Sequence, residues 1–268
     1  MNPTARGFYL GKNDPVESPF KEFKSYFADT LPAPPSSAHW GGRVTTPWQM
    51  DGNGPDPQLT IAPAGWSGCG DCTEVGKRNF LAVENFNEYG HTVVVPTPDQ
   101  VVQQYCVAQG CTPEQLFSNP SQYDNGEDET TTLTTWCQTE EYGVKLAFTA
   151  PVNVKSQDDI KNAIYLAGGL YIGIQLPQSA EQQFPNEWTW DPSSPIEGGH
   201  CVYLTGFSES YVALVTWGEL IQCTWEFLMN VIDEAHVLVS PQAVAAGKSP
   251  TGLLLQNWES DLNDLQPA

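Results

Sequence analysis

Apolar and polar residues alternate with a helical period through most of the first half of the chain. Such runs, when a capping residue precedes them or glycine follows them, predict helices. Polar and acidic residues dominate the stretch 119–131, which we expect to be a loop. The predicted helices cover residues 72–89, 97–110, 133–142 and 156–167, and shorter apolar runs at 91–96 and 145–154 predict strands.

The second half of the chain has a different pattern. Its apolar runs are short, rich in β-branched and aromatic residues, and separated by turn residues, as is typical of antiparallel strands. These runs lie at 170–177, 200–207, 211–217 and 236–240. A helix-rich half followed by a β-rich half predicts an α+β fold with two lobes, one helical and one built on an antiparallel sheet.

Residues 1–60 differ from both halves because proline and glycine are frequent there. Proline fixes φ and removes a backbone donor, so long helices are not expected, although a short helix fits residues 19–28. Trp40 and Trp48 make the stretch too apolar for a free tail. We expect an extended arm that lies on the domain or on a partner, followed by a domain at 61–245 and a C-terminal segment at 246–268.

Charge narrows the function classes. The chain carries 11 basic and 32 acidic residues, a formal net charge of −21. Such a surface repels phosphate backbones and anionic lipids, which excludes general nucleic-acid binding and argues against a membrane partner. The expected partners are proteins. The chain shows neither a signal-peptide pattern nor an apolar run of membrane-spanning length, so we expect synthesis in a host cytoplasm.

Cys72 stands where a nucleophilic thiol is favoured. It begins a predicted helix, directly after Asp71 as a candidate N-cap. Backbone N–H groups at a helix N-terminus stabilise a thiolate and can also bind the oxyanion of an acyl-transfer reaction. The sequence therefore predicts Cys72 as a candidate nucleophile.

His200 is the candidate base. It follows the pair Gly198-Gly199 at the start of a predicted strand, where small residues allow another element to approach closely. A base of this kind is expected far from the nucleophile in sequence but adjacent to it in space.

Three segments together resemble papain-like cysteine peptidases. Cys69-Gly-Asp-Cys72-Thr resembles the family's nucleophile segment, 198–207 (GGHCVYLTGF) its histidine segment, and Thr216-Trp217-Gly218 the segment that follows. The likeness covers roughly residues 60–240 and looks greatest to uncharacterised papain-like proteins encoded by bacteriophages and prophages. It implies a papain-like two-lobed fold, with Cys72 and His200 as the catalytic pair and Trp217 shielding the site. No cofactor or metal is implied.

The chain departs from the family pattern at two positions. Trp66 stands where the family's oxyanion glutamine is expected, six residues before the nucleophile, and is a second candidate for shielding the site. Val215 stands where the family has the asparagine that orients the histidine. Gln49 is an amide that could substitute.

Two function hypotheses follow from this pattern. The departures and the Pro/Gly-rich arm favour a virion structural or assembly component with a degenerate thiol-hydrolase site, such as a capsid decoration, head–tail or fibre-base protein. Its partners would be capsid or tail subunits. The alternative is an active papain-like cysteine peptidase that acts on a peptide substrate. A zinc site formed by Cys69, Cys72, Cys106 and Cys111 is a weaker reading. The seven cysteines are an odd number, so most are expected to be thiols.

Overall fold

One antiparallel sheet organises the protein. The computed structural model describes residues 9–26, 31, 33–44, 46–49, 58–85, 94–247 and 251. Within these residues the strand order is β2-β7-β3-β4-β5-β6, and β1 pairs with β4 off this path. The strands are β1 (Ala38–His39), β2 (Phe148–Pro151), β3 (Leu170–Pro177), β4 (Ile196–Phe207), β5 (Tyr211–Thr216), β6 (Glu219–Thr224) and β7 (Ile232–Val239).

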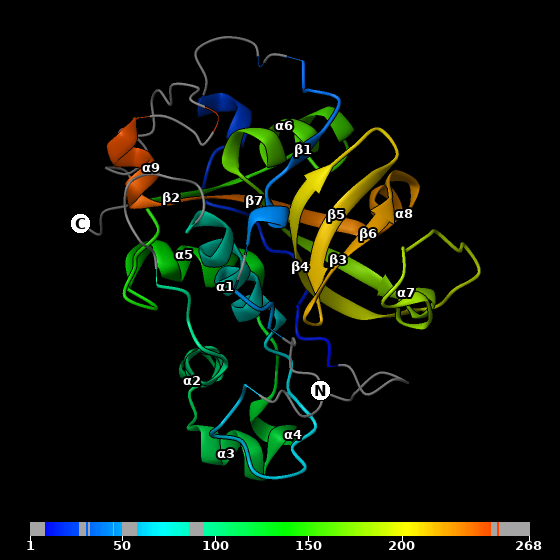
Figure 1. The fold of residues 1–268 in the computed structure, drawn as a ribbon. Coiled ribbons are helices and arrows are strands. Elements are labelled where there is room, and N and C mark those ends of the chain that lie inside the picture. The colour runs from blue at the N-terminus through cyan, green and yellow to red at the C-terminus, as the bar shows by residue number, and fades with distance from the viewer. Residues whose placement is uncertain are drawn as a thin grey trace.

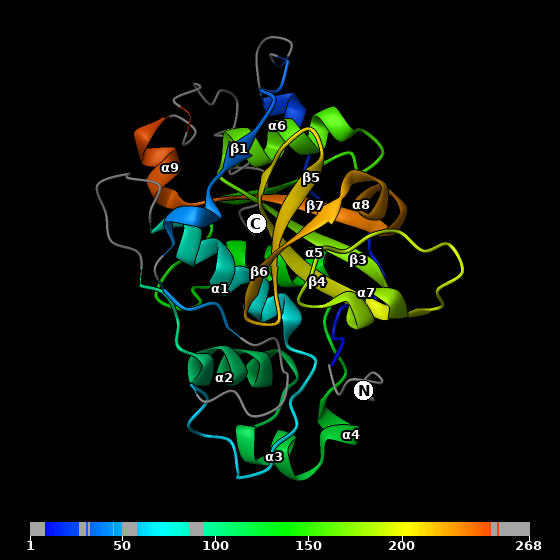
Figure 2. The same ribbon diagram turned by 45° about the vertical axis from the view of Figure 1, so that its right-hand side comes forward.

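Helices cover both faces of this sheet and extend away from it on one side (Figure 1). They are α1 (Cys72–Glu84), α2 (Pro98–Ala108), α3 (Pro113–Ser118), α4 (Pro120–Tyr123), α5 (Glu129–Gln138), α6 (Gln157–Ala167), α7 (Gln178–Gln183), α8 (Trp225–Val231) and α9 (Pro241–Ala246), with 3-10 turns η1 (Phe23–Tyr26) and η2 (Gly41–Arg43). Figure 2 shows α2, α3 and α4 gathered below α1, apart from the sheet. The mixed helical and antiparallel architecture confirms the predicted α+β class.

The alternation of side chains along β3 divides the core into two faces. Tyr171 points toward α1, whereas Ile172 and Ile174 point into the larger cluster on the other face. Gly76 lets α1 approach the sheet closely, because a Cβ there would lie 2.5 Å from the Tyr171 ring and 2.9 Å from Cys201 Sγ. The helix α1, which begins at the predicted nucleophile Cys72, is thereby packed directly on β3 and β4.

Capping chemistry explains why several helix starts were predictable. Thr97 forms a capping box with Gln100 at the start of α2, and the Ser156 side chain accepts a hydrogen bond at the start of α6. The α6 helix ends at Gly168, which has a φ of 84°. Glycine adopts this left-handed conformation without strain, which is why the pattern marks the helix end.

Two predicted elements differ from the structure. The expected loop 119–131 contains α4 and the first residues of α5, because the Asp128 side chain caps α5 ahead of the apolar residues that suggested a later start. The expected strand at 91–96 has no strand in its described part, 94–96, and its first three residues lie outside the described chain. The β6 strand and the helices α3, α7, α8 and α9 were not predicted.

The described parts of the N-terminal arm lie on the domain. Leu10 and Lys12 are buried, and β1 pairs with β4 at Gly206 and Phe207. The expected short helix within 19–28 is the single turn η1. The domain boundaries at 60 and 245 stay predictions, and most of the C-terminal segment lies outside the described residues. Among the described helices, none is both long enough and apolar enough to span a membrane.

Candidate functional site

The start of α1 meets the start of the buried part of β4. The backbone N–H of Cys201 donates a hydrogen bond to Cys72 Sγ at 3.4 Å. Cys201 directly follows His200, so the two segments that carry the candidate pair are in contact although 129 positions separate the bonded residues. A donated hydrogen bond favours the thiolate form of a cysteine. The Cys72 side chain is enclosed, with 1% of the residue exposed.

His200 is held by two residues of the β5–β6 hairpin. Its Nε2 lies 2.8 Å from Thr216 Oγ1. Its ring stacks on the Trp217 indole, with centroids 5.2 Å apart and planes inclined by 23°. His200 is fully buried, and burial lowers the pKa of its imidazole to about 3. The side chain is therefore oriented on one edge and covered on one face.

The hairpin turn explains how Thr216 and Trp217 reach the imidazole. Trp217 and Gly218, between β5 and β6, have φ values of 47° and 78°. Left-handed backbone is uncommon for a bulky residue, and it persists only when surrounding contacts hold it in place. Phe184 and Trp188 supply such contacts, with their rings edge-on to the Trp217 indole at centroid distances of 5.1 and 5.6 Å.

The orienting group is not at the position that the sequence comparison indicated. Val215 is buried on β5 opposite Tyr203, whereas the next residue, Thr216, contacts the imidazole. Thr216 thus gives the imidazole a hydroxyl partner at a position that the sequence comparison did not indicate. A hydroxyl directly before Trp217 was the available signal, and counting positions from the family pattern missed it.

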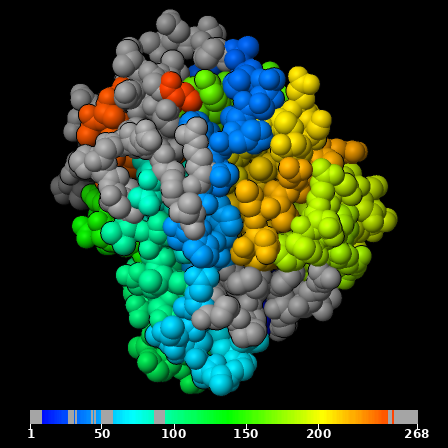
Figure 3. Space-filling model, viewed as in Figure 1, coloured from blue at the N-terminus to red at the C-terminus, as the bar shows by residue number. Residues whose placement is uncertain are grey.

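Trp66 and Gln49 lie in different surroundings. The Trp66 ring packs edge-on against Phe117 of α3, in a cluster separate from the one that contains Trp217. Gln49 is 2% exposed. Its neighbours Pro47 and Trp48 lie against α1, since Pro47 accepts a hydrogen bond from Arg78 and Trp48 packs on the cluster that contains Cys72. Figure 3 shows the described part of 33–49, in blue, between the helices and the β5–β6 hairpin.

The Gly198-Gly199 pair allows a close approach, as predicted, and the approaching element is the N-terminal segment 9–13. A Cβ on Gly199 would lie 2.3 Å from the carbonyl oxygen of Lys12. A Cβ on Gly11 would lie 1.6 Å from the carbonyl oxygen of Gly70, two residues before Cys72. The segment therefore passes directly between the residues that precede His200 and those that precede Cys72.

The cysteines do not pair. All seven are thiols, and burial raises the pKa of Cys69, Cys106 and Cys201. Cys69 and Cys106 share a cluster with Tyr105, whereas Cys72 belongs to the cluster under α1. The described side chains that could jointly hold a cation are Glu129, Glu234 and His236, not the four cysteines of the zinc reading.

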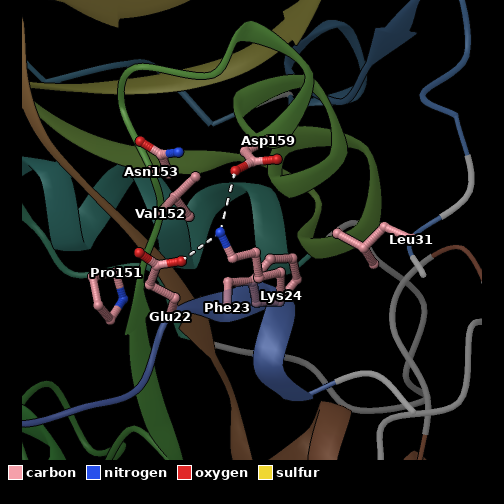
Figure 4. Close-up of a pocket in the computed structure, with 8 residues that line it drawn as sticks. All are labelled: Glu22, Phe23, Lys24, Leu31, Pro151, Val152, Asn153 and Asp159. Carbon is pink, nitrogen blue, oxygen red and sulfur yellow. Dashed lines mark ion pairs between the residues drawn. The ribbon is translucent and has the colours of Figure 1, made fainter. Parts of the chain in front are cut away.

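A surface pocket lies elsewhere on the molecule (Figure 4). Its walls come from η1, the end of β2 and α6, and Lys24 spans it between Glu22 at 2.7 Å and Asp159 at 4.0 Å. These side chains are largely exposed, and exposed ion pairs of this kind contribute little to stability. The pocket contains none of the candidate catalytic residues.

Comparisons with known proteins agree with this architecture. No family model and no curated protein matches the sequence. Among solved structures, the chain is similar to xylellain, a cysteine protease from Xylella fastidiosa, with a TM-score of 0.59 and 14% identity, covering 90% of this chain and 98% of that one. It is also similar to procathepsin B S9 from Trypanosoma congolense, with a TM-score of 0.56 and 9% identity, covering 87% and 86% of the two chains. The likeness to phage-encoded proteins stays a prediction. The chain has the two-lobed papain-like fold of the cysteine proteases.

Proposed function

We propose that the protein is a thiol hydrolase that acts on peptide or related amide bonds, with Cys72 as nucleophile and His200 as base. One observation carries the proposal: the residue after His200 donates its backbone N–H to Cys72 Sγ, while Thr216 and Trp217 hold the imidazole. An oriented imidazole beside a thiol at a helix N-terminus is the arrangement that nucleophilic catalysis by cysteine requires.

Each group has a defined role in the proposed reaction. The thiolate of Cys72 attacks the carbonyl carbon, and His200 gives the thiol's proton to the departing amine. Water then hydrolyses the thioester, with His200 accepting a proton from the water and returning it to the thiol. The N–H groups that begin α1 stabilise the oxyanion in both steps, and we assign a second donor role to the amide of Gln49.

Thr216 helps His200 to act as a base because it fixes which nitrogen of the imidazole carries the proton. We assign the proton to Nε2, which donates to Thr216 Oγ1, so that Nδ1 keeps the lone pair that a base needs. A hydroxyl can fix the ring in this way as a carboxamide would. The chain therefore retains an orienting partner for the proposed base.

The N-terminal segment 9–13 keeps this site in a latent state. Its Gly11 lies on Gly70, and its Lys12 N–H donates to the Gly199 carbonyl at 3.2 Å. Cys72 and His200 are enclosed while the segment is in place, and a substrate must displace it. The same enclosure accounts for an imidazole pKa far below its ordinary value.

Alkylation kinetics test the proposed pair. In the full chain carrying Gly11→Ala, which displaces the segment, iodoacetamide should label Cys72 at pH 6 faster than it labels glutathione. Adding His200→Ala should return the rate to that of an ordinary thiol, because the base no longer stabilises the thiolate. A Cys72 rate no higher than that of glutathione in the folded Gly11→Ala variant would refute the activated nucleophile.

The enclosure also favours a second candidate, a non-catalytic component of a viral assembly. In that role the buried Cys72 and His200 would contribute packing, and capsid or tail subunits would be the partners. The segment would then stay closed under all conditions, and opening it would reveal no activated thiol. The alkylation experiment separates the two functions by that outcome.

A further inference from the structure

Residues 11–13 are bound through their backbone as an extended peptide. On one side, Glu127 donates its N–H to Gly11 and accepts from the Asn13 N–H, each at 2.7 Å. On the other side, Gly199 accepts from the Lys12 N–H. These hydrogen bonds involve only backbone atoms of the segment, so another extended peptide can form them equally well, whatever its side chains. In both ribbon views the dark-blue N-terminal segment passes beside β4 (Figure 1 and Figure 2).

The Lys12 side chain extends from this backbone into an acidic cluster, defined here as Glu129, Asp233 and Glu234, in which Glu129 and Glu234 are buried and Asp233 is partly exposed. Its Nζ lies 3.0 Å from a carboxylate oxygen of Asp233 and 3.0 Å from one of Glu234, and the side chain is fully enclosed. Gly173 of β3 makes room for it, because a Cβ there would lie 1.9 Å from Lys12 Cε.

The acidic cluster holds more carboxylates than one ammonium can pair with. Glu129 begins α5 and is fully buried, and the Cys201 thiol is a hydrogen-bond partner of its carboxylate. Burial raises its pKa, and the neighbouring Glu234 raises it further. Burial would lower the pKa of Lys12, yet the charges of Glu234, Glu129 and Asp233 hold it above its ordinary value. Lys12 therefore stays charged in the site, and the cluster is built for a cation.

The site sits beside the candidate catalytic pair. Glu127, which binds the segment's backbone, also accepts a hydrogen bond from the hydroxyl of Thr73, the residue after Cys72. Gly199, the other backbone partner, is the residue before His200. A peptide that forms the same backbone bonds and places a side chain in the acidic cluster therefore runs past both Cys72 and His200.

We propose that the acidic cluster of Glu129, Asp233 and Glu234 selects peptide substrates with a lysine or arginine side chain, and that Lys12 of the chain's own N-terminal segment is its resident competitor. This inference rests on the proposed thiol-hydrolase function. An apolar side chain at this place would leave buried carboxylates without a counter-charge, which disfavours such peptides. Displacement of Lys12 by a basic substrate exchanges one buried ion pair for another.

Peptidyl electrophiles test the selectivity. The full chain with Gly11→Ala is treated with two tripeptidyl vinyl sulfones that differ only in lysine or norleucine next to the reactive residue, and labelling of Cys72 is followed by mass spectrometry. The lysine probe should react at least about 10-fold faster, the scale of one hydrogen bond to a charged group. Glu234→Gln should reduce that ratio at least about threefold.

A second measurement does not depend on a substituted cluster. A synthetic peptide of residues 9–16 (YLGKNDPV) should slow labelling of the Gly11→Ala protein, and its norleucine-12 analogue should do so at least about 10-fold more weakly. Equal effects of the two peptides, or equal rates for the two probes, would overturn the inference. If iodoacetamide itself finds no activated Cys72, the proposed function fails instead, so the two failures are distinguishable.

Discussion

The substitution Gly11→Ala probes how the site is closed. It adds a Cβ 1.6 Å from the Gly70 carbonyl oxygen and 2.2 Å from its carbon, where ordinary contact begins at 3.4 Å. Gly70 cannot retreat easily because its N–H donates to the buried Asp124 carboxylate at 2.9 Å. The N-terminal segment must therefore move away from Gly70, by more than an ångström.

The free energy that closes the segment can be assembled from its contacts. The backbone bonds at Gly11, Lys12 and Asn13 contribute about 3 kcal/mol together, and burial of Leu10 about 2 kcal/mol. The buried ion pairs of Lys12 add about 3 kcal/mol, and ordering residues 9–13 opposes closure by about 5 kcal/mol. Closure is thus favoured by about 3 kcal/mol, a factor on the order of 100 in population.

Losing this free energy should expose Cys72. Iodoacetamide labelling of Cys72 should rise on the order of 100-fold in Gly11→Ala relative to the unsubstituted chain. Cys111, which is half-buried, serves as the internal reference. Gly42→Ala is the matched control, since a Cβ at Gly42 meets nothing within 4 Å. An unchanged Cys72 rate in a folded Gly11→Ala protein whose segment has become protease-sensitive would refute closure by residues 9–13.

Three further outcomes follow from the site and its surroundings. In the Gly11→Ala background, Thr216→Val removes the hydroxyl that holds His200 and should lower the labelling rate of Cys72 about 10-fold, with Thr216→Ser restoring it and Val215→Ala leaving it unchanged. Lys77→Met leaves the buried Glu74 and Glu141 carboxylates without the ammonium that lies 2.7 and 2.6 Å from them, and should reduce the free energy of unfolding in urea by about 3–5 kcal/mol; a loss below about 1 kcal/mol would contradict this account. Burial disfavours the imidazolium form of His200, so its NMR signals should not titrate between pH 8 and pH 5 in the closed protein. In Gly11→Ala the pKa of the imidazole should rise toward about 6.5 as water reaches the ring. Titration near pH 6.5 in the closed protein would show that the ring is already hydrated.

The sequence was informative wherever structure depends on neighbours along the chain. Thr97 and Ser156 cap their helices with bonds to residues three positions on, so local pattern alone located α2 and α6. The strands β3, β4 and β5 were visible because their β-rich runs end at turn residues. The prediction failed where two local signals conflict. The polar and acidic composition of 119–131 predicts a loop, but Asp128 in this stretch caps α5.

Only some residues of the candidate site could be predicted from local sequence signals. Cys72, His200 and Trp217 carry signals in their own segments, namely a helix start, a glycine pair and a Trp-Gly turn. Thr216 carries a signal only through its place directly before Trp217, and Gln49 carries none, because its surroundings depend on which distant element packs beside it. Counting positions from a family pattern pointed to Val215, whereas the hydroxyl that meets the imidazole belongs to Thr216.

The sequence by itself determined the fold class, the starts of α1, α2 and α6 and the order of the candidate chemical groups, since capping, side-chain alternation and turn residues act within a few positions. Tertiary structure alone decided that the N-terminal segment lies against Gly70 and Gly199, that Thr216 contacts His200 and that Lys12 meets Asp233 across 221 positions. Such contacts depend on the path of the whole chain in space. A lysine in a proline-rich arm and two acidic residues on a late strand have no local feature that links them until the sheet brings them together.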